Sequence, residues 1–123
     1  MQILIDAATL GLIALAIDVP WLLYIQPTAS KLIHGIQGSA LSIRFAPAAA
    51  VYAAIGFLLT RARSPTDAAL IGAATYAVYD FTNYATLKNY TLDFAIMDII
   101  WGGVLFGLTA TVAEKIGAFR FRG

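Results

Sequence analysis

The chain has 123 residues, of which 60% are hydrophobic and 12% charged, and its mean hydropathy is +0.78. A soluble domain contains about half apolar and about a quarter charged residues, and a small one buries only about two-thirds of the surface of its unfolded chain, so this composition indicates a lipid bilayer as the solvent. The formal net charge of +1 excludes a strongly basic nucleic-acid-binding module, and the lack of cysteine excludes disulfides, thiolate metal sites and thiol nucleophiles.

Four stretches approach the roughly 20 apolar residues that a transmembrane helix needs. They predict spans at about 3–25, 43–60, 67–87 and 92–113. Because these spans and their turns account for the chain, we expect a single transmembrane domain over residues 1–123, an all-α four-helix bundle in up-down-up-down order. A cleaved signal peptide is disfavoured because no Lys or Arg precedes residue 31 and Asp18 interrupts the first apolar run.

The connection over residues 26–44 is the long one. Leu32, Ile33 and Ile36 share one helical face and Lys31 and His34 lie largely opposite, which predicts a short helix in the membrane interface. The other two links, 61–66 and 88–91, are turns.

The basic residues are divided unequally between the two sides of such a bundle, five with the termini and three opposite: Arg61, Arg63, Lys115, Arg120 and Arg122, against Lys31, Arg44 and Lys88. The excess of positive charge on cytoplasmic loops predicts that both termini lie in the cytoplasm. An aromatic belt is expected near the opposite interface, formed by Trp21, Tyr24, Tyr84 and Tyr90.

Acidic residues lie within the predicted spans, whereas Lys and Arg do not. A carboxylate at membrane depth raises the free energy of membrane insertion by at least about 2.5–3.5 kcal/mol, so such a residue is treated as a candidate functional group. Asp6 lies near a helix end. Asp18, Asp80 and Asp98 each lie six or seven residues from the end of their span on the side of the membrane opposite the termini. At about 1.5 Å per residue, all three carboxyls are expected roughly 9–11 Å below one membrane surface.

Other polar and aromatic side chains follow these carboxyls at helical spacing. Asn83 is expected to join the carboxyls directly, and the supporting residues are Trp21, Tyr76, Tyr79, Thr82, Thr86, Trp101 and Gly102. Three neighbouring carboxylates without a buried base cannot all be ionised, so the cluster is expected to hold a proton or a hard cation. Its oxygen atoms suit sodium, calcium or magnesium better than a transition metal, and no cofactor or resident metal is predicted. The alternative is that the cluster only fixes helix register.

The run Y-D-F-T-N-Y-A-T-L from Tyr79, followed by D-I-I-W-G from Asp98, resembles a family of small bacterial membrane proteins, domain of unknown function 2177. The D-x-x-W at Asp18 is similar to that family's first-helix motif. The resemblance spans nearly the whole chain and implies a four-helix integral membrane protein. It implies no activity.

The favoured function is conduction or transport of protons or small cations, with Asp18, Asp80, Asp98 and Asn83 as the ion-binding or relay groups. Two alternatives stay open: a lipid-handling membrane enzyme or lipid-binding protein, and a structural or accessory subunit. An enzyme is the less favoured class. The residue inventory also excludes a buried retinal lysine, a bis-histidine haem within one chain and a Ser-His-Asp triad.

Gly103 and Gly107 form a G-x-x-x-G spacing, a pattern that lets helix backbones approach closely in lipid. Gly103 lies about 140° around the helix from Asp98, so we expect these glycines to contact another copy of the chain in a homo-oligomer. The alternative is that they pack against a neighbouring helix of the same chain.

Overall fold

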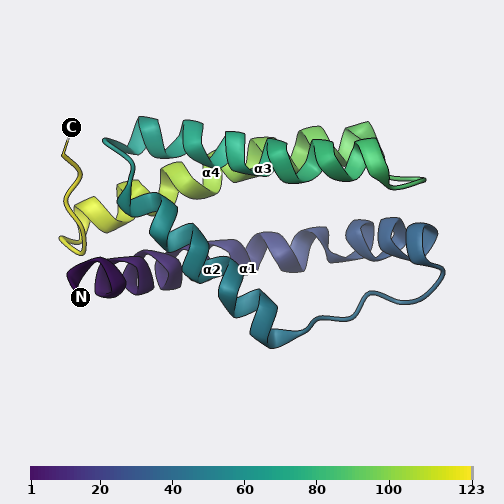
Figure 1. Cartoon of the computed structure of the whole chain (residues 1–123), viewed down its shortest axis with the longest axis horizontal. Helices are drawn as coiled ribbons and strands as arrows, with labels where there is room; N and C mark the ends of the chain where they lie inside the picture. The colour runs from purple at the N-terminus through teal and green to yellow at the C-terminus, as the bar shows by residue number, and fades with distance from the viewer. Residues whose placement is uncertain (123) are drawn as a thin grey trace.

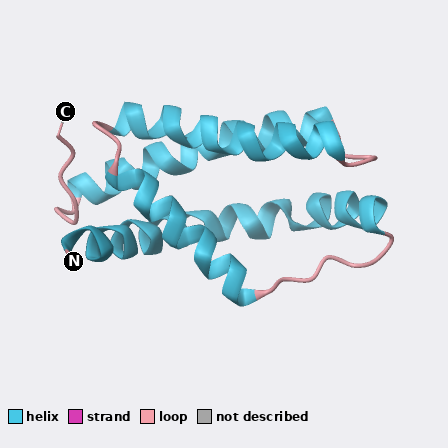
Figure 2. Cartoon of the chain, in the orientation of Figure 1, coloured by secondary structure: helices cyan, strands magenta, loops and turns pink. Residues whose placement is uncertain are grey.

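The computed structural model describes residues 1–122, which form four helices and no strand: α1 (Gln2–Gln37), α2 (Phe45–Thr60), α3 (Pro65–Thr86) and α4 (Leu92–Lys115). The helices run alternately between the end that holds both termini and the opposite end (Figure 1). Short loops join them, apart from the extended segment between α1 and α2 (Figure 2). The expected all-α four-helix bundle is confirmed.

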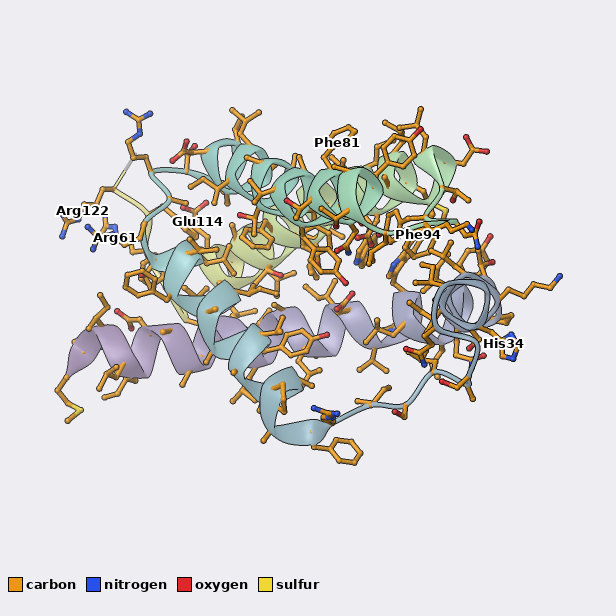
Figure 3. The ribbon with its side chains drawn as sticks, turned by 45° about the vertical axis from the view of Figure 1, so that its right-hand side comes forward. His34, Arg61, Phe81, Phe94, Glu114 and Arg122 are labelled. Carbon is orange, nitrogen blue, oxygen red and sulfur yellow. The ribbon has the colours of Figure 1, made fainter. Side chains whose placement is uncertain are left out.

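The first helix is longer than the sequence suggests. Residues 26–37, expected as a separate helix, continue α1, which has 36 residues and a length of about 54 Å against the roughly 30 Å of a bilayer core. Pro20 and Pro27 both lie inside α1 without ending it. Each proline removes a backbone hydrogen bond and favours a bend, and the last turns, around His34, are seen nearly end-on while the first turns lie across the view (Figure 3).

Small residues let the helices pack as two close pairs, α1 with α2 and α3 with α4. A Cβ atom added to Gly56 would lie 1.8 Å from the carbonyl oxygen of Ala7, and one added to Gly72 would lie 2.3 Å from that of Gly102. Backbones that touch in this way leave no room for a side chain, which is how helices associate in lipid. The two pairs are joined mainly through α1 and α4.

Side-chain caps fix where α3 and α4 begin. The Ser64 hydroxyl accepts a hydrogen bond from the Asp67 N–H (3.1 Å), and the Asp67 carboxylate accepts one from the Arg63 N–H (2.8 Å). The Thr91 hydroxyl accepts one from the Phe94 N–H (3.3 Å). Such caps each stabilise a helix by about 1 kcal/mol, and they hold the turns that bring the polar residues of α3 and α4 to the same depth.

The apolar core occupies the half of the bundle nearer the termini. Its buried residues are Leu10, Ala14, Ile55, Leu59, Ala62, Ala68, Leu105, Phe106, Ala110, Ala113 and Phe121. Phe121 belongs to the tail after α4, which folds back onto the bundle with the Ala118 N–H donating to the Ala113 carbonyl (2.8 Å). This half is therefore sealed by hydrocarbon side chains.

The outer surface is apolar over most of its area. Large side chains that point away from the bundle include Leu23, 74% exposed, and Val78, 71% exposed. Within residues 1–122, α1 and α4 are long and apolar enough to cross a membrane, and α2 is a shorter apolar helix. An exposed apolar surface of this extent is typical of contact with lipid.

Candidate functional site

Asp18 links three helices through its carboxylate. One oxygen accepts a hydrogen bond from the hydroxyl of Tyr52 on α2 (2.5 Å), and the other accepts one from the indole N–H of Trp101 on α4 (2.8 Å). Asp18 itself, on α1, is buried. Both carboxylate oxygens are thus satisfied, as a buried charge requires.

Trp21 supports this arrangement by stacking and not by hydrogen bonding. Its ring lies parallel to that of Trp101, with centroids 4.8 Å apart and an interplanar angle of 10°. The sequence predicted both Trp21 and Trp101 as supporting residues, and within residues 1–122 only the indole N–H of Trp101 bonds a carboxylate. The stack holds Trp101 in the orientation in which it reaches Asp18.

Asp80, on α3, is completely buried and only half satisfied. Its Oδ1 atom accepts a hydrogen bond from the Tyr90 hydroxyl (2.5 Å), while its Oδ2 atom has no partner among the described residues. The Asn83 side chain, one turn further on, lies near the Tyr90 hydroxyl. Burial raises the pKa of Tyr90, which lies in the loop before α4, and the bond to Asp80 raises it further, so this phenol stays a neutral donor.

Asp98, on α4, is half-buried and lies near Asp80. The two carboxyls are close enough to influence one another, and Asp18 is a more distant neighbour of Asp98. An ionised carboxylate only accepts hydrogen bonds. The contact between Asp80 and Asp98 is therefore a hydrogen bond if one of them carries a proton, and an unfavourable approach of two acceptors if neither does.

Tyr76 connects this pair with Asp18. Its side chain interacts electrostatically with all three carboxyls. It packs on the backbone of α4 at Gly102, where an added Cβ atom would lie 2.4 Å from the Tyr76 ring. Gly102 thus supports the cluster as expected, by making room for Tyr76.

Three of the predicted supporting residues are not brought into the cluster. Tyr79 is 62% exposed, and Thr82 and Thr86 are exposed as well. Both threonine hydroxyls donate to carbonyl groups of their own helix, those of Val78 (2.5 Å) and Thr82 (2.7 Å). Successive helical residues are rotated by about 100°, which turns these three side chains toward the outer face of α3.

The sequence reasoning missed two phenols that bind the carboxylates. Tyr52 carries the only side-chain polar atom between Phe45 and Leu59, and that isolation in an apolar span was a usable signal. Tyr90 was expected in an interfacial aromatic belt, but it is buried against Asp80. Tyr90 lies in the loop at the expected end of the bundle, but its burial was not predicted, and the sequence around it gives no sign of the contact.

The remaining acidic and glycine positions lie outside the cluster. Asp6 accepts a hydrogen bond from the Gln2 side chain (2.8 Å) near the start of α1. Gly103 and Gly107 face α3 of the same chain: Cβ atoms added there would lie 3.4 Å from the Ala69 carbonyl oxygen and 3.2 Å from the Ala69 Cβ. These contacts favour the packing alternative over the homo-oligomer contact for both glycines.

Comparison with known proteins places these features in one family. A family model described as a predicted membrane protein, domain of unknown function 2177, matches residues 3–114, nearly all of the four helices. No curated protein and no solved structure matches the chain. The chain thus belongs to the predicted membrane protein family known as domain of unknown function 2177.

Proposed function

We propose that this protein conducts protons or small cations across the membrane, with Asp80 and Asp98 as the pair that binds the transported ion. The observation that supports this most is the fully buried Oδ2 atom of Asp80, which lacks a partner although a second carboxyl lies beside it. Burying an unsatisfied carboxylate in a bilayer is costly, and a shared proton or a cation removes that cost.

A proton suits the geometry better than a metal cation. Residues 1–122 contain no group of three acidic, His or Cys side chains arranged to hold a metal ion. A pair of carboxyls needs only one proton to form a hydrogen bond. In the proposal, Tyr90 and Asn83 orient Asp80 so that its free oxygen faces Asp98.

Asp18 has a different role in the proposal. Both of its oxygens are already bonded, to Tyr52 and Trp101, so it holds α1, α2 and α4 together. The proton moves between the Asp80–Asp98 pair and the loop side. Passage through the rest of the bundle requires the apolar half to hydrate, as hydrophobic constrictions in channels do when they open.

The membrane topology belongs to the same proposal. The alternating helices and the excess of basic residues at the termini support four spans with both termini in the cytoplasm. Single cysteines test this, because the chain has none of its own. Ser39→Cys and Arg122→Cys are expected to react with an impermeant reagent from opposite sides, and labelling from one side would contradict the topology.

Flux measurements test the function. The purified chain in liposomes, with a pH-sensitive dye inside, is expected to dissipate a proton gradient, and Asp80→Asn or Asp98→Asn is expected to abolish this flux. Asp93→Asn is the matched control, because Asp93 is exposed in the first turn of α4. Flux of Na⁺ or K⁺ that depends on Asp80 would identify a cation as the substrate. Folded protein without any flux would contradict the proposal.

Lipid binding is the second candidate, and one observation favours it. A groove of about 570 Å³ lies between α1 and α4, with Trp21, Tyr24, Ile96, Ile100 and Trp101 among its lining residues. Its wall includes the indole that bonds Asp18. Copurified lipid that is displaced by Ile100→Trp, with no proton flux in the parent protein, would favour this function over conduction.

A further inference from the structure

A second cavity lies at the opposite end of the bundle from the loop-side carboxyls, where the two termini meet. It has a volume of about 640 Å³, and it is formed by the start of α1, the turn after α2 and the tail after α4. Its lining includes four arginines and one aspartate: Arg61, Arg63, Arg120, Arg122 and Asp6. Arg61 and Arg122 are seen together at this end in Figure 3. The cavity is therefore strongly positive.

The tail is held in place by its aromatic residues. Phe121 is buried in the apolar core, and its ring packs edge-on against that of Phe119 with centroids 4.8 Å apart. Phe121 is buried, whereas Arg120 and Arg122 on either side of it are exposed and line the cavity together with Phe119. These basic residues are thus positioned by the fold.

The arginines are poorly neutralised by the protein itself. Among residues 1–122 the only ion pair joins Arg63 to Asp67 (3.8 Å), and Asp6 is bonded to Gln2. The guanidinium group forms paired hydrogen bonds to phosphate oxygens. Four such groups around one cavity therefore suit a phosphate-bearing anion.

We propose that this cavity binds the phosphate headgroup of an anionic phospholipid at the membrane surface. The location selects a lipid over a soluble phosphate compound, because the cavity opens at the end of an apolar bundle, where headgroups lie, and basic pockets at such positions bind acidic headgroups. Phe119 lines the same cavity and offers an apolar contact beside the charges. Arg120 and Arg122 lie beyond residues 3–114, so the site includes positions outside the part of the chain that matches the family.

Lipid competition tests this site. The full chain in a zwitterionic detergent is titrated with short-chain phosphatidylglycerol and, separately, with phosphatidylcholine, and binding is followed by native mass spectrometry. Phosphatidylglycerol is expected to bind at least tenfold more tightly. Loss of each arginine is expected to lower the affinity for phosphatidylglycerol about fivefold. The double variant Arg120→Gln/Arg122→Gln is therefore expected to lower it roughly 25-fold. Both side chains are exposed, so the fold is kept.

Two further variants separate a built site from general charge attraction. Lys31→Gln/Arg44→Gln removes two positive charges outside this cavity, and it is expected to leave the lipid preference unchanged. Phe121→Ala keeps every arginine but frees the tail, and it is expected to lower the preference. The proposal would be overturned if the Lys31/Arg44 variant lost as much affinity for phosphatidylglycerol as the Arg120/Arg122 variant. It would also be overturned if the parent protein did not prefer phosphatidylglycerol to phosphatidylcholine. Glycerol phosphate that binds as tightly as the lipid would identify a soluble ligand and overturn the lipid assignment.

Discussion

The two halves of the bundle are stabilised by different means. Near the termini, Leu10, Leu59, Leu105 and Phe106 are completely buried and hydrocarbon contacts fill the space between helices. Near the long loop, helices are joined by hydrogen bonds from phenol and indole groups to buried carboxylates. The comparison indicates that the first half is held together by apolar packing, while the second half contains buried carboxyls, which are costly in a membrane and therefore mark a candidate functional site. In the proposed function, the first half is also the barrier to ions.

The largest expected effect lies in the apolar half. Phe106→Ala removes a completely buried ring and is expected to destabilise the fold by about 3–5 kcal/mol. Phe81→Ala is the control, because Phe81 is 45% exposed and points away from the bundle in Figure 3. Unfolding by denaturing detergent measures both. If this half is the barrier, proton flux per folded Phe106→Ala molecule rises, and a large stability loss with reduced flux would contradict that role.

In the polar half, the Asp80–Asp98 pair is expected to act as a unit. Asp80→Asn and Asp98→Asn each change stability, and the double variant is expected to differ from their sum by about 0.5–3 kcal/mol, as contacting residues do. A double-mutant cycle in mild detergent gives this coupling. Strict additivity would show that the two carboxyls do not interact.

A smaller effect is expected at Tyr90. Tyr90→Phe leaves the Oδ1 atom of Asp80 without its donor, and losing a partner of a buried group costs about 1–3 kcal/mol. Tyr84→Phe is the matched control, because Tyr84 is 46% exposed. Equal unfolding midpoints for the two variants would count against the Tyr90–Asp80 bond.

The smallest effects concern two helical glycines. A Cβ atom at Gly35 would meet nothing within 4 Å, whereas one at Gly107 would lie 3.2 Å from the Ala69 Cβ. Gly35→Ala is expected to stabilise the helix by about 0.5–1 kcal/mol. Gly107→Ala is expected to stabilise it less, because Ala69 must shift.

Light scattering of the Gly103→Leu/Gly107→Leu variant tests assembly. If the parent protein is an oligomer and this variant is a folded monomer, the result would support the intermolecular contact.

Much of this architecture could be predicted from the sequence, because in lipid each span must be a long apolar helix. The shared depth of Asp18, Asp80 and Asp98 was predicted by counting residues along helices. In the structure Asp98 lies near Asp80, whereas Asp18 bonds Tyr52 and Trp101, and among the described residues the three do not form a group that could hold a metal ion. Helix rotation was harder to predict, because polar and apolar residues do not alternate cleanly in α3, and Thr82 and Thr86 face outward. The lone polar atom of Tyr52 in an apolar span was a usable signal, but its partner, and the burial of Tyr90 against Asp80, depend on tertiary packing, which no local pattern encodes.

Infrared spectroscopy tests the central claim, a proton shared by Asp80 and Asp98, most directly. The protein in lipid at neutral pH is expected to show the carbonyl stretch of a protonated carboxyl group, shifted in D₂O. This band is expected to disappear in Asp80→Asn and in Asp98→Asn and to persist in Asp93→Asn. A parent spectrum without the band, or a band that survives in both Asp80→Asn and Asp98→Asn, would contradict the claim.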